Sequence, residues 1–184
     1  MKACKPVLII ILFFLIQFQS KAQAYDGVID RKVIAGYTLV GDKSGMELKY
    51  DMGLSDLLSL GVGITHLFFT TPTPTDESDK IEYFIEKSDF GAFLNFHMFQ
   101  KLINAPEIDV YAGPDLTFKS LGIHAGIKYN FSERFGLYFQ ASQSFSNSLF
   151  GLGDATDNPS NHFGKKFSIA TGLTINLNWK QYFN

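Results

Sequence analysis

Apolar and polar residues alternate along most of the chain after residue 25, which is the period of a β-strand with two different faces. In the last segment one parity is almost entirely apolar: Phe167, Ile169, Thr171, Leu173, Ile175, Leu177 and Trp179. The opposite parity carries small and polar residues such as Ser168 and Asn176. Seven earlier segments repeat this period, at 29–40, 46–52, 57–69, 89–98, 108–116, 121–131 and 135–146. The pattern therefore predicts eight strands.

The links between these segments alternate in length. Tight links follow the second and sixth segments, at 53–56 and 132–134, and an intermediate link near 100–107 follows the fourth. The long polar links, at 70–82 and 147–166, fall on the other side of the predicted sheet. This one-sidedness is expected of an even-stranded barrel with both termini on its short-turn side. Together with the polarity of the two strand faces, the sequence predicts an all-β fold, an eight-stranded antiparallel up-and-down transmembrane β-barrel.

Soluble barrels and outer-membrane barrels differ in which set of alternate residues faces inward. A soluble eight-stranded barrel, such as a lipocalin, points its apolar side chains inward, whereas an outer-membrane barrel points them toward lipid. Here the polar parity is rich in glycine and carries few charges of mixed sign, which suits a narrow lumen where charges pair. Aromatic residues gather near the strand ends, as in the girdles of membrane barrels. The pattern favours the membrane class, and a secreted lipocalin-like barrel that binds an apolar ligand is an alternative.

The ionisable residues of the polar parity are expected to form a structural network in the lumen. They are Lys32, Glu47, Lys49, Asp51, Asp89, His97, Asp109, Asp115, His124 and Lys128. An eight-stranded interior is just wide enough for its own side chains to fill it. Large lumen residues such as Tyr111 and Tyr138 therefore predict a barrel with no open pore. The expected role is structural or surface-interacting, with the long loops outermost.

The first 24 residues have the pattern of a secretory signal peptide. Lys2 and Lys5 precede an unbroken apolar run over residues 7–16, and Ala22-Gln23-Ala24 fits the small-x-small cleavage pattern. We expect cleavage after Ala24 or after Ala22, and a barrel domain over residues 25–184.

Removal of this segment changes the composition of the mature chain. It takes away three lysines and no acidic residue, so the formal net charge falls from −2 to −5. It also removes Cys4, the sole cysteine, which excludes disulfides and thiolate zinc sites from the mature protein. With 15% aromatic residues the chain is not disordered. Without a Lys/Arg cluster it is not expected to bind nucleic acid.

On these features the chain resembles the small eight-stranded outer-membrane β-barrels of the OmpA/OmpX type, over essentially all of residues 25–184. The resemblance implies residence in the cell outer membrane, contact with outer-membrane lipid, and insertion by the barrel-assembly machinery. Members of such families end in an aromatic residue that assists recognition by that machinery. Here the outward parity of the last strand runs through Trp179, Gln181 and Phe183, and Asn184 follows. The resemblance names no surface partner.

The sequence offers no catalytic constellation, cofactor fingerprint or zinc spacing. Outer-membrane lipid deacylases of similar size carry a His-x-Ser pair, and none of the four histidines here has a serine two residues later. The oxygen-bearing residues Asp154 and Asp157 in the long loop match no defined calcium loop. We therefore expect no catalytic residue, metal or cofactor. A lipid-modifying enzyme is the other alternative, and it would need a nucleophile such as Ser160 near His162.

Overall fold

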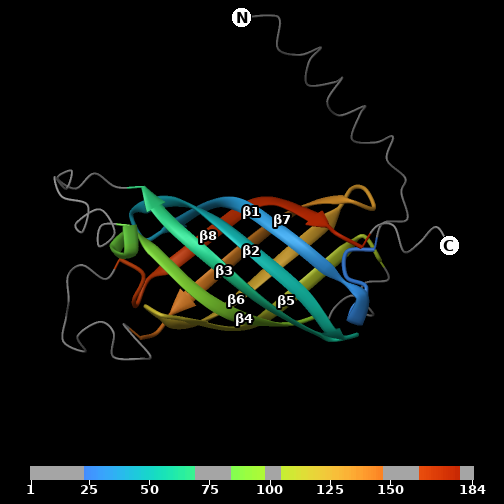
Figure 1. Ribbon diagram of the computed structural model, residues 1–184, viewed down its shortest axis with the longest axis horizontal. Helices are drawn as coiled ribbons and strands as arrows, with labels where there is room; N and C mark the ends of the chain where they lie inside the picture. The colour runs from blue at the N-terminus through green and yellow to red at the C-terminus, as the bar shows by residue number, and fades with distance from the viewer. Residues whose placement is uncertain (1–22, 69–83, 98–104, 147–161, 179–184) are drawn as a thin grey trace, which may run out of the picture.

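A closed barrel of eight antiparallel strands makes up the fold (Figure 1). The computed structural model describes residues 23–68, 84–97, 105–146 and 162–178. The strands are β1 (Arg31–Val40), β2 (Lys43–Ser55), β3 (Leu58–Phe68), β4 (Ser88–Phe96), β5 (Ile108–Thr117), β6 (Leu121–Asn130), β7 (Phe135–Ser144) and β8 (Phe167–Asn176). Each strand pairs with the next, and β1 pairs with β8 to close the sheet. The predicted eight-stranded up-and-down topology is confirmed.

The two ends of the barrel differ. The connections after β1, β3, β5 and β7 lie at one end, which we call the loop end, and those after β2, β4 and β6 lie at the other, the turn end. A short 3-10 turn, η1 (Gly27–Ile29), precedes β1 at the turn end, and a single helical turn at residues 84–87 precedes β4 at the loop end (Figure 1). Within the described ranges no helix has the length and apolar character needed to cross a membrane.

The second strand is longer than its sequence pattern predicts. It continues to Ser55, through a register shift between Gly53 and Ser55, and the turn consists of Asp56 and Leu57. The prediction of a tight link at 53–56 was therefore wrong in its bounds. The strand extends past Met52 because the Gly53 N–H donates to the Asp30 carbonyl at 2.8 Å. Asp30 directly precedes β1, so this contact lies outside the β2–β3 hairpin.

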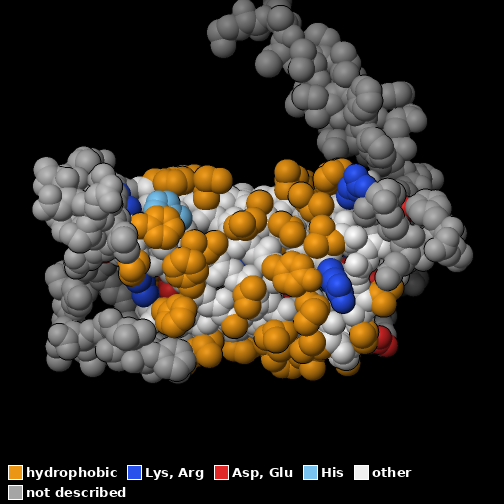
Figure 2. All heavy atoms as spheres, in the orientation of Figure 1, with side chains coloured by type: hydrophobic (Ala, Val, Ile, Leu, Met, Phe, Trp, Pro, Cys, Tyr) orange, Lys and Arg blue, Asp and Glu red, His pale blue; other side chains and the backbone are white. Residues whose placement is uncertain are grey.

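Apolar side chains cover the outer wall of the barrel, as the alternation predicts. Leu48, Val62, Ile123, Leu137 and Leu173 each expose between 47% and 56% of their surface. On the face shown in Figure 2, hydrophobic side chains spread along the wall, and charged side chains appear mainly toward its ends. The outward rows are therefore the apolar ones.

Exposed aromatic rings gather near both ends of the wall. At the loop end they are Phe68, Phe84, Phe118, Phe145 and Phe167, and at the turn end they are Phe96, Tyr129 and Phe135. His66 lies among the loop-end rings, 5.2 Å from the Phe84 ring, and its Nδ1 is 2.8 Å from Ser88 Oγ. The aromatic residues predicted beyond residue 178 lie outside the described residues.

Several large apolar side chains point inward, which the strand pattern did not predict. Ile34 packs with Tyr138 and Ala170 in the interior. At the loop end Leu67 packs with Val40 and Phe163. The inner parity is therefore not purely polar, because a lumen of this width is filled by whatever side chains close the space between its walls.

The β4–β5 ladder is the sparsest in the barrel, with four bridged pairs. Its pairing is interrupted opposite Gly113 and Pro114, although the register resumes on both sides. Proline has no N–H to donate to a ladder. A Cβ at Gly113 would overlap the Leu94 carbonyl, so glycine is required where the two backbones approach.

Candidate functional site: the barrel interior

Two ion pairs and two histidine–aspartate contacts in the interior bring together eight of the ten ionisable residues predicted for the lumen. The pairs are Glu47–Lys49 at 2.9 Å, Asp51–Lys128 at 2.7 Å, His97–Asp109 at 2.9 Å and His124–Asp115 at 2.8 Å. The remaining two have partners outside the predicted set: Lys32 pairs with Asp30, and Asp89 accepts from Thr117 Oγ1 at 2.7 Å. Opposite charges are thus matched locally, as a desolvated interior requires.

The Asp51–Lys128 pair crosses the lumen between β2 and β6. Lys128 is 1% exposed and Asp51 is 4% exposed, so both charges are removed from water. Asp51 Oδ2 also accepts a hydrogen bond from Asn95 Nδ2 at 3.1 Å. Such additional hydrogen bonds are what let a buried pair offset part of its desolvation cost.

A serine, a histidine and an aspartate form a linear arrangement at the turn end. His97 Nε2 lies 2.9 Å from Ser59 Oγ, and His97 Nδ1 lies 2.9 Å from both carboxylate oxygens of Asp109. All three side chains have hydrogen-bond partners when the Ser59 hydroxyl donates to His97 Nε2 and the His97 Nδ1–H donates to the Asp109 carboxylate. The order of nucleophile, base and orienting carboxylate is the one used in covalent catalysis.

This arrangement has no room for a substrate. Ser59 and Asp109 are completely buried, and the Tyr25 ring stacks on His97 at 3.5 Å between centroids. Asn95 Nδ2 occupies the remaining side of Ser59, donating to Oγ at 3.0 Å. The geometry therefore satisfies buried polar groups, which is the common reason for such networks in a protein interior.

Asn95 joins the turn-end residues to the middle of the barrel. Its side-chain oxygen lies 2.7 Å from His124 Nε2, and His124 in turn contacts Asp115. The connected side chains come from β2 to β6 and from the residue that follows β4. The network therefore ties five neighbouring strands together across the lumen.

Aromatic rings fill the space that the ionic network leaves. Tyr111 and Tyr138 are each 2% exposed, and Phe93 is 9% exposed. Tyr138 donates to Glu47 Oε1 at 2.6 Å, and the Tyr111 ring lies 4.4 Å from Lys128 Nζ. The wide side chains thus also carry polar or cation–π contacts.

Glycines face these rings because a larger residue would not fit. A Cβ at Gly61 would overlap the Phe93 ring, and one at Gly36 would overlap the Tyr138 hydroxyl. The glycine-rich inner parity and the rings that fill the lumen are therefore two aspects of one packing arrangement.

Replacing Gly61 with alanine is expected to lower the free energy of unfolding by about 1–3 kcal/mol, the usual cost of overpacking. Gly63→Ala should cost less, because a Cβ there would lie 2.7 Å from Lys49 Cγ, whereas a Cβ at Gly61 would lie 2.0 Å from Phe93 Cζ. Urea titration of both variants in detergent or lipid measures the difference. Trimming the ring in Gly61→Ala/Phe93→Leu should recover stability, and equal losses at the two glycines would contradict the packing argument.

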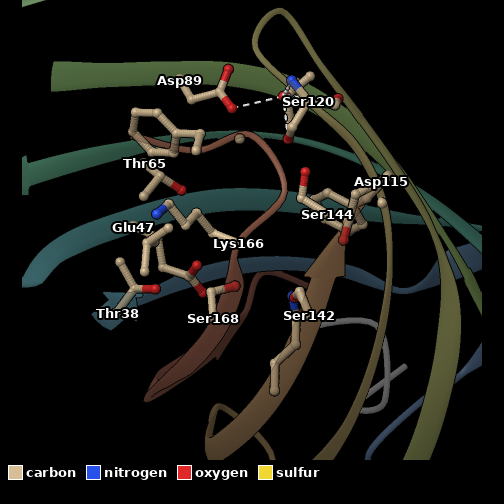
Figure 3. A pocket seen from close by; sticks show the side chains of 18 of the residues that line it. Thr38, Glu47, Thr65, Asp89, Asp115, Ser120, Ser142, Ser144, Lys166 and Ser168 are labelled. Atoms are coloured by element: carbon tan, nitrogen blue, oxygen red, sulfur yellow. Dashed lines mark hydrogen bonds between the residues drawn. The ribbon is translucent and has the colours of Figure 1, made fainter. Parts of the chain in front are cut away.

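A cavity of about 110 Å³, with both polar and apolar groups in its wall, occupies the loop-end half of the lumen (Figure 3). Most of its polar lining consists of hydroxyl, amide and carboxylate groups: Thr38, Glu47, Thr65, Asp89, Asp115, Thr117, Ser120, Gln140, Ser142, Gln143, Ser144 and Ser168. Lys49 and Lys166 add two ammonium groups, and Phe93 and Phe163 add rings. A cavity of this size with these polar groups in its wall has room for several water molecules.

Lys119 lies in the connection between β5 and β6, next to Ser120, which lines the cavity. Its Nζ donates to the carbonyls of Ile85 and Glu86, each at 2.6 Å, and its backbone N–H donates to Asp89 Oδ1 at 3.2 Å. Burial lowers the pKa of the Lys119 ammonium, against the opposing effect of the Asp89 and Glu86 carboxylates. These contacts hold the helical turn before β4 against the β5–β6 connection.

The sequence model of a family of unknown function, DUF6646, matches residues 15–177. The chain belongs to that family. No curated protein matches the chain.

Two solved structures resemble this DUF6646 protein. The N-terminal β-barrel domain of OprF from Pseudomonas aeruginosa matches with a TM-score of 0.52 and 14% identity, over 83% of this chain and 100% of that one. A chain from a study of designed transmembrane β-barrels matches with a TM-score of 0.48 and 12% identity, over 84% of this chain and 100% of the other. The likeness to the OprF domain establishes the barrel fold and nothing finer.

The loop residues considered for chemistry in this DUF6646 protein are only partly described. Ser160, Asp154 and Asp157 lie outside the described residues. His162 Nε2 is 3.9 Å from Glu86 Oε1, and burial lowers the pKa of its imidazole. Within the described ranges no three His, Cys, Asp or Glu side chains are grouped as a metal site requires.

Proposed function

We propose that this DUF6646 protein is an integral β-barrel of the cell outer membrane, with a closed interior and a structural or surface-interacting role at its loop end. Its N-terminal segment is proposed to be a signal peptide that directs it to the envelope. Outer-membrane lipid and the barrel-assembly machinery are the partners that this location implies.

The distribution of polarity is the single observation that carries the proposal. The outward rows of the wall are apolar, and the interior contains buried lysine, aspartate, glutamate and histidine side chains. A soluble monomer rarely exposes a continuous apolar surface larger than a few hundred Å². Lipid contact accounts for this surface, and strands of 9 to 13 residues are long enough to cross a bilayer when tilted.

Membrane residence is tested by expressing the full-length gene in a bacterium with two membranes and fractionating the envelope. We expect the protein in the outer-membrane fraction after a carbonate wash, with a heat-dependent shift in electrophoretic mobility that reports a folded barrel. Recovery in the soluble periplasmic pool would support the lipocalin-like alternative and contradict the proposal.

The lumen is expected not to conduct ions. Tyr111 and Tyr138 are buried in the lumen, and the buried Asp51–Lys128 pair crosses it below the loop-end cavity. Planar bilayer recordings of the purified barrel should therefore stay at the baseline of the protein-free membrane, with a 16-stranded porin as the positive control. Steps of uniform conductance that scale with protein concentration would contradict the closed interior.

A further inference from the structure

Residues 23–30, which precede β1, form a strap across the turn end of the barrel. Its first part contacts two of the three connections there. The Gln23 carbonyl accepts from Asn130 Nδ2 at 2.8 Å, at the end of β6. The Ala24 N–H donates to the Pro106 carbonyl at 2.6 Å, in the connection between β4 and β5.

Tyr25 attaches the strap to the third connection, between β2 and β3. Its hydroxyl lies 2.6 Å from the Ser55 carbonyl and 2.5 Å from the Leu58 carbonyl, so its single hydrogen is shared between these two acceptors. Burial, followed by the nearby Asp30 carboxylate, raises the pKa of the Tyr25 phenol, so the hydroxyl remains a donor. The Tyr25 ring covers His97, and only 2% of the residue is exposed.

The rest of the strap is fitted to β2 at backbone level. A Cβ at Gly53 would overlap the Gly27 carbonyl, so glycine is needed at this crossing. Gly27 has a φ of +70°, in the left-handed region that favours glycine. The Asp30 carbonyl then accepts from the Gly53 N–H, and Asp30 pairs with Lys32 inside the lumen.

We infer that the strap is a permanent part of the mature barrel and that signal peptidase cuts between Ala22 and Gln23. This inference rests on the proposed export of the protein. Ser20-Lys21-Ala22 offers the small-x-small pattern for this cut. A cut after Ala24 would remove Gln23 and Ala24, and with them the anchors to two of the three turn-end connections. Ala24 is completely buried, and its N–H donates to the Pro106 carbonyl at 2.6 Å.

Intact-mass and N-terminal peptide analysis of the protein extracted from the outer membrane tests the inference. We expect the mature chain to begin at Gln23, as free glutamine or in the cyclised form that an N-terminal glutamine yields by losing ammonia. A chain that begins at Tyr25 would overturn the inference and leave the proposed outer-membrane location intact. A chain that retains residues 1–22 would overturn the signal peptide as well.

Two substitutions in the full-length gene separate the cleavage sites without depending on barrel folding, since signal peptidase acts before the barrel forms. A large residue directly before the cut blocks cleavage. Ala22→Leu is therefore expected to leave most of the chain as precursor. Ala24→Leu should be processed to the wild-type extent, measured as the precursor-to-mature ratio after a short induction. Accumulation of the Ala24→Leu precursor would place the cut after residue 24, where Ala22 is the other small residue of the pattern, so Ala22→Leu would impair processing as well.

Discussion

Replacing Lys128 with methionine is expected to lower the free energy of unfolding of the barrel by about 3–5 kcal/mol. Lys128 is the ion-pair partner of Asp51, at 2.7 Å, and both residues are almost completely buried. Methionine fills a similar volume but leaves the Asp51 carboxylate in the lumen without its counter-charge. The loss should appear as a lower midpoint in urea titrations of the protein refolded into lipid vesicles.

The double variant Asp51→Leu/Lys128→Met is the matched control. It removes both charges, and replacing a buried ion pair by apolar residues is often neutral or stabilising. It should therefore recover most of the stability that Lys128→Met loses, apart from the hydrogen bond that Asn95 donates to Asp51. If the single variant unfolds at the wild-type urea concentration, Lys128 does not compensate a buried charge.

Arginine at Leu173 is expected to cost about 2–4 kcal/mol in a bilayer, the range for a charged residue facing lipid near the midplane. Leu173 is 48% exposed on the outer wall and pairs with Ala35 of β1 and Leu137 of β7. Its neighbours on the wall therefore offer no counter-charge. The cost should be measured by reversible unfolding from lipid vesicles.

Ile175→Arg provides the internal comparison. The strand pattern alone ranks Ile175 and Leu173 equally, and the structure separates them. Ile175 is the next-to-last residue of β8 and pairs with Phe135, one of the turn-end aromatic residues. The cost of arginine falls to about 0–1 kcal/mol near an interface, so Ile175→Arg should destabilise less. Wild-type stability of Leu173→Arg in lipid would contradict the outward assignment of this parity.

The fold was largely predictable because a strand with two different faces has a two-residue period that no other element shares. The period locates all eight strands, and the ends of β2 and β8 were the least accurate. At the end of β2 the backbone is engaged by the strap through the Asp30 carbonyl, a contact between distant segments. Such tertiary contacts leave no trace in local alternation.

The interior was predictable as a set of residues but not as a set of contacts. Parity places Asp51 and Lys128 in the lumen, yet their pairing depends on the registers of the four consecutive strand pairs from β2 to β6. Ser59 and Asn95 share the inner parity, but small polar residues on that parity are common. The positions of Ser59 and Asn95 in the network follow only from the register of the paired strands.

No pattern in the sequence predicts the position of Tyr25. It precedes the first alternating segment, so neither its burial nor its stacking on His97 follows from a period. The apolar residues Ile34 and Phe93 have the inner parity, and their burial shows that in so narrow a lumen parity predicts direction better than polarity does.

Site-directed labelling along β7 tests the orientation of the wall most directly. The proposed mature chain contains no cysteine, so single cysteines at Phe139 and Ser142 can carry a spin label without background. Phe139 is 49% exposed on the outer wall, and Ser142 lines the loop-end cavity. In lipid vesicles the label at 139 should be relaxed by oxygen dissolved in the bilayer, and the label at 142 by a water-soluble nickel chelate. The opposite result, with 139 in water and 142 in an apolar medium, would contradict the assignment of the apolar rows to lipid.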